Sequence, residues 1–189
     1  MNNHYWKVFK KNLIILTAII GVIIPIICFY LLPSLNILLE PLSKFGIASE
    51  TKYIWNGFLI SLSLMLYLTN DNLIDNIEDK ITNIQYKLLT AVNIISSLGL
   101  SLTGLIDMKS KLLHLGFATI FFLAYTAFIF WWGFLNIKYD LKKAILSIAT
   151  SILIILSSIV TIKGLHFGYG MFELVFITLI IIWNIKVKK

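Results

Sequence analysis

Long apolar runs alternate with short polar segments along this chain. The runs predict six helices, over residues 13–32, 53–69, 86–106, 111–135, 144–162 and 171–185. Each run is close to the roughly 20 apolar residues that an α-helix needs to cross a bilayer. The pattern therefore predicts an all-α, polytopic membrane protein, with residues 1–189 forming a single transmembrane domain built as a six-transmembrane-helix bundle.

The segment over residues 70–85 differs from these runs because it is polar and acidic. Its apolar positions nevertheless recur at helical spacing, at Leu73, Ile74, Ile77, Ile81 and Ile84. We therefore expect an amphipathic segment that lies on the cytoplasmic membrane surface or extends the helix predicted over residues 86–106.

The hairpin over residues 96–135 is the stretch around which we expect the bundle to form. Only Asp107, Met108, Lys109 and Ser110 separate its two apolar runs, so its helices must lie antiparallel. Small polar residues recur every four positions in the first helix, a pattern that lets helix backbones approach closely in lipid. The second helix carries His114 about one turn from its start.

The composition also indicates that lipid surrounds the chain, and it narrows the range of possible partners. Hydrophobic residues make up 59% of the chain and charged residues only 13%, against about 25% charged in soluble domains. Every basic residue is a lysine, which argues against nucleic acid as a partner because arginine is the residue suited to bidentate phosphate and base contacts. The absence of arginine, with many Ile and Asn residues, indicates an AT-rich, bacterial genome.

The lysines predict the orientation of the bundle. With six spans, both chain ends share one side, and that side also receives most of the positive charge. Placing the termini inside puts there Lys7, Lys10, Lys11, Lys80, Lys87, Lys138, Lys142, Lys143, Lys186, Lys188 and Lys189, and leaves outside Lys44, Lys52, Lys109, Lys111 and Lys163. The positive-inside rule then predicts a multi-pass protein of the inner (plasma) membrane with both termini cytoplasmic. The run over 13–32 ends without a small-residue cleavage site, so we expect it to be retained.

On this orientation, several titratable residues gather at the outer face: Glu50, Asp107, His114, His166 and Glu173. A histidine within an apolar helix usually faces the bundle interior or a wet cavity. One interpretation is a shallow pocket that contacts lipid headgroups. The other is an interfacial histidine hydrogen-bonded to a neighbouring helix, beside solvated loop charges.

Three further polar residues lie inside or at the start of the apolar runs: Asn56, Asn93 and Tyr125. We expect the asparagines to bridge helices and the tyrosine hydroxyl to find a partner inside the bundle, since lipid offers none. A transport path usually shows ionisable residues at mid-membrane, and the six runs have none there.

The sequence carries no recognised catalytic motif, so whether the protein is an enzyme stays open. The outer-face cluster has two histidines and several carboxylates, but the sequence has no HExxH motif, so we predict no metal site. We predict no cofactor either, because a haem would want paired histidines at depth. Cys28 is the only cysteine, which excludes a CxxC redox site.

Three segments together resemble a known superfamily: a first outer loop PLSKFGIASETKYIWNG, the hairpin with His114, and a last loop and helix KGLHFGYGMFE. The chain is similar to the DRAM/Frag/Sfk superfamily of six-helix membrane proteins and its bacterial relatives. The matching points are Ser43, Gly46, Glu50, His114 and Glu173, while Lys44 stands where the eukaryotic motif usually has aspartate. Eukaryotic members are associated with autophagy regulation and with glycolipid-anchor or phospholipid handling, so the resemblance implies a lipid-related or regulatory role. It supplies no catalytic residues.

We therefore expect an integral membrane protein that contacts or senses lipid headgroups through the outer-face cluster. Membrane lipids are its expected partners, and self-association or a membrane-protein partner is left open. Two alternatives remain: a metal-dependent membrane hydrolase acting on lipid, and a small channel or transporter or a subunit of a membrane complex.

The predicted orientation can be tested with single cysteines introduced in a Cys28→Ala background. We expect Lys44→Cys to react with a membrane-impermeant maleimide on intact cells. Lys138→Cys should react only after permeabilisation, because it lies on the opposite side. The reverse pattern of labelling would show that the termini lie outside.

Overall fold

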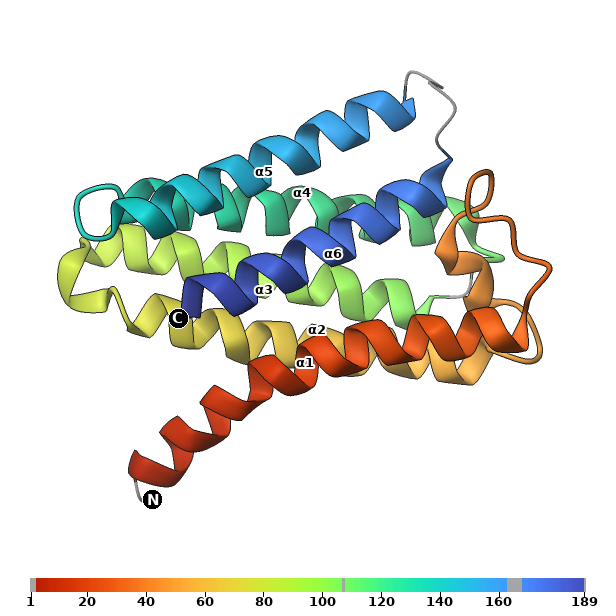
Figure 1. The fold of residues 1–189 in the computed structure, drawn as a ribbon, viewed down its shortest axis with the longest axis horizontal. Helices are drawn as coiled ribbons and strands as arrows, with labels where there is room; N and C mark the ends of the chain where they lie inside the picture. The colour runs from red at the N-terminus through yellow and green to blue at the C-terminus, as the bar shows by residue number, and fades with distance from the viewer. Residues whose placement is uncertain (1–2, 107, 163–167, 189) are drawn as a thin grey trace.

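Six long helices run back and forth along one axis of the molecule (Figure 1). The structure is a computed structural model that describes residues 3–106, 108–162 and 168–188. Its elements are α1 (Asn3–Leu31), η1 (Leu42–Gly46), α2 (Lys52–Asp75), η2 (Glu78–Lys80), α3 (Asn83–Leu105), α4 (Lys111–Asn136), α5 (Leu141–Ile162) and α6 (Tyr169–Lys188). All six α-helices in the described ranges contain a stretch long and apolar enough to span a membrane, which confirms the predicted all-α, six-span fold class.

The helices form a closed arrangement in which each packs against the next in chain order and α6 returns to α1. The first and last helical turns lie at the same end of the bundle (Figure 1), as an even number of spans requires. We call the opposite end, which carries residues 32–51 and the start of α4 and α6, the distal end.

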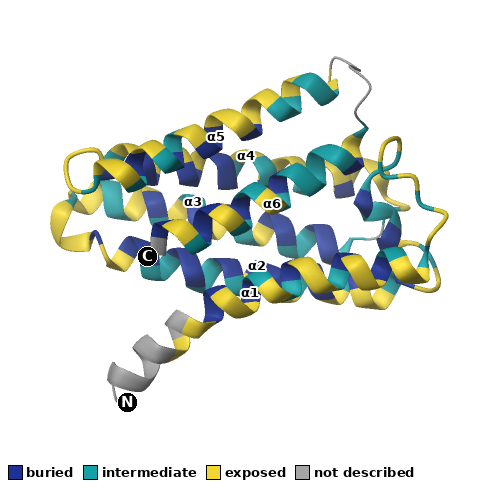
Figure 2. Cartoon of the chain, in the orientation of Figure 1, coloured by how far each residue is buried: buried dark blue, intermediate teal, exposed yellow. Residues whose placement is uncertain are grey.

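Large apolar side chains cover the outside of the bundle. Ile26, Leu64, Leu112, Leu123 and Ile162 are each more than half exposed, and Figure 2 shows exposed positions along the outward sides of the helices. Exposure on this scale would be costly in water and costs nothing against lipid tails. The outer surface thus matches a multi-pass membrane protein.

The segment over residues 70–85 corrects one expectation. It is not a separate amphipathic helix, and its first part extends α2 rather than the helix that follows. Burial explains the difference, because Leu73 and Ile74 are almost completely enclosed and Trp132 Nε1 of α4 donates to the Leu73 carbonyl at 3.2 Å. Only Leu73 and Ile74 of the apolar positions lie in α2, whereas Ile84 is 72% exposed at the start of α3.

The start of α3 is set by a capping box at Thr82. Its hydroxyl accepts from the Gln85 backbone N–H, and the Gln85 side chain accepts from the Thr82 backbone N–H. This pair satisfies two amide donors at the helix start. The helix therefore begins at Asn83, three residues before the predicted start.

The loop over residues 32–51 is anchored to the distal end of the bundle. In η1, Leu42 and Phe45 are fully buried, and the Phe45 carbonyl accepts from the Thr51 hydroxyl at 2.7 Å. The Gly168 backbone N–H donates to the Leu38 carbonyl at 2.6 Å, which ties the same loop to the start of α6. The loop is thus a fixed part of the bundle surface.

Close packing of α3 on α4 gives a test of the fold. A Cβ at Gly99 would lie 2.9 Å from the Phe121 backbone nitrogen and 3.1 Å from the Phe117 carbonyl oxygen. We expect Gly99→Leu to lower stability by about 1–3 kcal/mol, because overpacking forces the two backbones apart. Thermal unfolding in detergent measures the effect.

The matched control is Gly116→Leu on α4. A Cβ there would meet nothing within 4 Å, so this variant should unfold at or above the wild-type temperature. Equal destabilisation of the two variants would contradict the close crossing of α3 and α4.

Candidate functional site

A large cavity lies inside the bundle, with a volume of about 710 Å³. Side chains of all six helices and of residues 41–44 line it, and most of them are apolar. Its size falls in the range of about 300–1,000 Å³ that is typical of small-molecule sites. The cavity is therefore the main candidate for a binding site.

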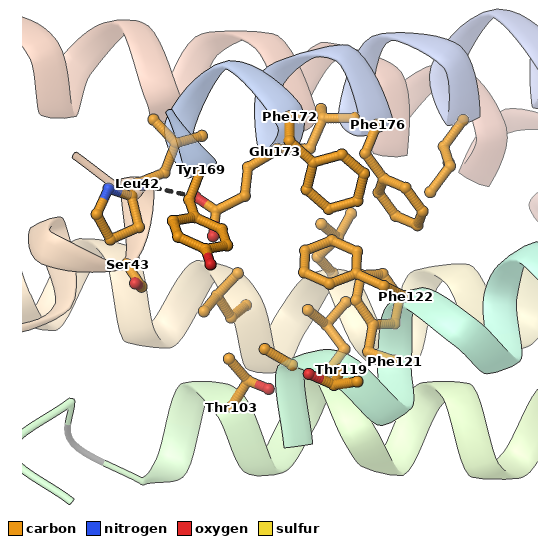
Figure 3. Close-up of a pocket in the computed structure, with 18 of the residues that line it drawn as sticks. Leu42, Ser43, Thr103, Thr119, Phe121, Phe122, Tyr169, Phe172, Glu173 and Phe176 are labelled. Carbon is orange, nitrogen blue, oxygen red and sulfur yellow. Dashed lines mark hydrogen bonds between the residues drawn. The ribbon is translucent and has the colours of Figure 1, made fainter. Parts of the chain in front are cut away.

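Aromatic rings from α4 and α6 form one wall of this cavity (Figure 3), and they are Phe121, Phe122, Phe172 and Phe176. The centroid of the Phe122 ring lies 4.7 Å from that of Phe176 and 5.0 Å from that of Phe172. Both pairs meet edge to face, the arrangement that aromatic rings favour. This wall gives the cavity a firm apolar surface.

Charged residues that line the cavity lie at the distal end. Glu173 stands in the second turn of α6, and its Oε2 accepts a hydrogen bond of 2.6 Å from the Leu42 backbone N–H (Figure 3). Lys44, within η1, and Lys111, at the start of α4, line the same region. We call this end of the cavity the mouth.

His114 also lines the cavity and is buried, with 7% of its surface exposed. Its Nδ1 lies 2.9 Å from the Ile106 carbonyl oxygen. A carbonyl only accepts, so Nδ1 must carry the proton, and in the neutral ring Nε2 is left as an acceptor. Nε2 is buried without a partner.

Other buried polar atoms around the cavity also lack partners. Trp55 Nε1, Thr69 Oγ1 and Asn184 Oδ1 share this property with His114 Nε2, and all four residues line the cavity. By contrast, the hydroxyl groups of Thr103 and Thr119 bond to carbonyls of their own helices. An unpartnered buried polar group costs about 1–3 kcal/mol. The four residues reach the cavity surface through other atoms, because the unpartnered atoms are themselves enclosed.

The predicted outer-face cluster is therefore partly brought together. His114 and Glu173 line one cavity, each bonded to a different backbone group. Glu50 is exposed, does not line the cavity, and accepts from the Ser49 hydroxyl at 2.9 Å. Asp107 and His166 lie outside the described residues.

Two carboxylates of the distal loop are stabilised in their charged form. Lys44, followed by the Asn36 backbone N–H, lowers the pKa of the Glu40 carboxyl below its ordinary value. The pKa of Glu50 is lowered by its own backbone N–H and by the Ser49 hydroxyl. The distal surface thus carries fixed negative charge beside the lysines.

A buried polar network lies near the other end of the cavity. Tyr125 donates to Asn70 Oδ1 at 3.3 Å and accepts from Asn184 Nδ2 at 3.1 Å. Asn70 Nδ2 donates to Asn93 Oδ1 at 3.0 Å, and Asn93 Nδ2 donates to the Tyr67 carbonyl at 3.1 Å. The network joins α2, α3, α4 and α6.

The sequence analysis predicted only some of the residues in this buried polar network. Asn93 bridges α2 and α3 and the Tyr125 hydroxyl has partners inside the bundle, whereas Asn56 bonds the Gly46 carbonyl of η1 at 3.2 Å. Asn70 was missed because it was assigned to a polar surface segment. Asn184 was missed although an amide inside an apolar run was a usable signal.

The His, Cys, Asp and Glu residues of the described ranges do not cluster as metal ligands. Within residues 3–106, 108–162 and 168–188, no group of three or more His, Cys, Asp or Glu residues is placed to hold a metal ion. A metal-dependent hydrolase therefore draws no support from the described part of the chain.

Comparisons of the chain with protein-family models, with curated proteins and with solved structures find no match. The resemblance to the DRAM/Frag/Sfk superfamily therefore stays a prediction. The structure defines the class of protein as an integral, multi-pass membrane protein with an internal cavity.

The polar network can be tested by removing one hydroxyl. We expect Tyr125→Phe to lower stability by about 1–3 kcal/mol, because it leaves Asn70 and Asn184 with unpaired polar atoms away from water. Thermal unfolding in detergent measures the change. Tyr139→Phe is the control, since the Tyr139 hydroxyl bonds the Lys80 carbonyl at an exposed site. Equal stability of wild type and Tyr125→Phe would rule out a structural role for the network.

Proposed function

We propose that this protein binds a membrane lipid, with hydrocarbon inside the cavity and the headgroup at the mouth. The proposal rests on how polar and apolar residues are distributed around one site. This site is an apolar cavity of about 710 Å³ whose charged residues all lie at its distal end. This arrangement is complementary to an amphiphile that lies along the bundle axis.

The interior suits hydrocarbon. Below the mouth, the wall consists of apolar side chains such as Phe58, Leu62, Phe176 and Ile180. Water in such a space would lose hydrogen bonds without replacement, and large cavities with apolar walls favour apolar occupants. A lipid chain from the surrounding bilayer is the most abundant apolar occupant available to a membrane protein.

The cavity also reaches the outer surface of the bundle. Leu115 and Leu123 of α4 and Ile162 of α5 line it and are each more than half exposed. These side chains face the region where lipid would surround the protein. A lipid chain would thus have a lateral path into the cavity beside the distal halves of α4 and α5.

The mouth offers both donors and acceptors to a headgroup. The ammonium groups of Lys44 and Lys111 donate, while the Glu173 carboxylate accepts. A headgroup that itself carries both kinds of group, such as a hydroxylated or zwitterionic one, satisfies this set best. With the termini cytoplasmic, this headgroup would belong to the outer leaflet of the plasma membrane.

Blocking the cavity tests the proposal. Ala118 of α4 lines it and is partly buried, so Ala118→Trp would fill the space without removing a hydrogen bond. We expect this variant to lower the amount of lipid that co-purifies with the protein by about tenfold, equivalent to about 1.4 kcal/mol of binding free energy. Lipid extracted from purified protein is quantified by mass spectrometry.

The control places the same side chain elsewhere on the helix. Ala127 of α4 is exposed and does not line the cavity, so Ala127→Trp should retain wild-type lipid. Equal lipid content in both variants would refute binding inside the cavity.

A second arm of the same experiment tests the headgroup. Glu173→Gln and His114→Gln should change which headgroup classes co-purify, because they alter the charge and donor pattern at the mouth. Glu50→Gln, at an exposed site away from the cavity, should not. Unchanged headgroup classes in all three variants would show that the mouth does not recognise the headgroup.

A further inference from the structure

Glu173 places a carboxylate in the distal part of the cavity (Figure 3). Its Oε2 accepts from the Leu42 backbone N–H, but no hydrogen bond among the described residues involves its Oε1. Oε1 is also absent from the enclosed polar atoms that lack partners in the described ranges, so it has accessible surface. Because Glu173 lines the cavity, an occupant can reach this oxygen.

The lysines at the mouth do not neutralise this carboxylate. Lys44 Nζ pairs instead with Glu40 Oε1, four positions earlier in the distal loop. Among the residues that the structure describes, no ion pair joins Glu173 to Lys111 or to any other cation. A carboxylate that stands among apolar side chains without a counter-charge is costly in free energy, so a cation in the cavity would be stabilised there.

Aromatic rings lie on the same side of α6 as this carboxylate. Tyr169 is four positions before Glu173 and Phe176 three positions after it, so the three side chains share one face of the helix, and all three line the cavity. The Phe122 ring of α4 meets Phe176 edge to face at 4.7 Å. Figure 3 shows these rings at the cavity together with Glu173. The face of an aromatic ring attracts cations, and organic ammonium groups are bound in this way.

The surroundings of Glu173 favour an organic cation over a metal ion. A metal cation such as Ca²⁺ takes about six to eight oxygen ligands. In the described part of the chain, no group of three or more His, Cys, Asp or Glu residues is placed to hold one. An alkylammonium group needs fewer polar contacts, because its carbon atoms pack against rings and apolar walls. The site therefore matches an amine joined to hydrocarbon.

We propose that Glu173 and the rings of Tyr169 and Phe176 bind the organic ammonium group of an amphiphile. The positive nitrogen would lie near Glu173 Oε1, and the hydrocarbon would extend past Phe176 into the apolar part of the cavity. This inference rests on the proposed function and deepens it by naming the charged group of the ligand. An aminophospholipid headgroup and a free long-chain amine both carry this group, and the experiment distinguishes them.

The test compares two probes with the same decyl tail. Decyltrimethylammonium carries a positive charge, whereas decyldimethylamine N-oxide has a head of similar size and no net charge at slightly alkaline pH. Both are measured by equilibrium dialysis on the full chain in a non-ionic maltoside detergent, against a detergent blank. We expect wild type to prefer the ammonium probe by about tenfold beyond the preference of the blank, which is within the range of cation contacts shielded from water.

Variants at the site locate the preference. Glu173→Gln removes the charge but keeps a carbonyl oxygen that can accept from the Leu42 N–H, so it should fold as wild type does and bind both probes with nearly equal affinity. Tyr169→Leu removes a ring and should lower the preference about two- to fivefold, whereas Tyr169→Phe keeps the ring and should not. Glu50→Gln is the matched control, because Glu50 is exposed and does not line the cavity.

The outcomes separate the two proposals. If wild type binds both probes equally, or if the preference persists in Glu173→Gln, the inference fails while binding of an amphiphile in the cavity stands. If neither probe binds wild type, the inference fails, and the proposed function fails with it when Ala118→Trp also leaves the co-purified lipid unchanged. Loss of the preference in Glu173→Gln, with Glu50→Gln unchanged, supports the ammonium site.

A further arm identifies the source of the ammonium group. Mass spectrometry compares the lipid that co-purifies with wild type and with Glu173→Gln against the lipid of the whole membrane. Enrichment of amine-bearing phospholipid that Glu173→Gln abolishes supports the site with a lipid headgroup as its ligand. Equal lipid composition, together with the preference for decyltrimethylammonium, supports the site with a free long-chain amine as its ligand.

Discussion

A polar side chain enclosed in a membrane bundle must find its hydrogen bonds among the helices, since neither lipid nor bulk water supplies them. Tyr125 and the three asparagines around it meet this constraint by bonding to one another and to the Tyr67 carbonyl. Helix association in lipid draws little from apolar burial, so such bonds and close backbone approach hold the bundle together. Under the same constraint, the few buried polar atoms that lack a hydrogen bond are unfavourable for stability.

Those atoms are concentrated around one space rather than scattered through the bundle. Four of the five unpartnered buried atoms in the described ranges belong to residues that line the cavity. In a fully packed interior, each unpartnered atom would lower stability, and an apolar substitution would remove that cost. Their grouping beside the cavity shows where the packing of the bundle is least complete.

The sequence predicted the parts of this structure that depend on local composition. Six apolar runs gave six helices, and the short turn after residue 106 gave a tightly packed α3–α4 pair, with Gly99 against the Phe121 backbone. The boundary at residues 70–85 was wrong because the spacing of Leu73 and Ile74 describes burial equally well on a membrane surface and inside a bundle. Only the contact with Trp132 decides between them.

Local sequence patterns could not predict the cavity, since an apolar residue that lines a space looks the same in sequence as one that packs against a neighbour. Its polar ends come from segments more than 100 positions apart, as Leu42 and Glu173 illustrate. His114 and Glu173 were singled out because ionisable groups are rare in apolar runs. Thr69 could not be, because nothing in the sequence shows that its hydroxyl lacks a partner.

The hydrogen bond between Glu173 and the Leu42 amide links the cavity to the distal loop. The same carboxylate that faces the cavity also holds the segment that begins η1, and Gly168 holds that segment a few residues earlier at Leu38. An occupant that bonds to Glu173 would compete with a backbone amide of the distal loop. Filling or emptying of the cavity would thereby change how firmly the loop over residues 32–51 is held at the distal end.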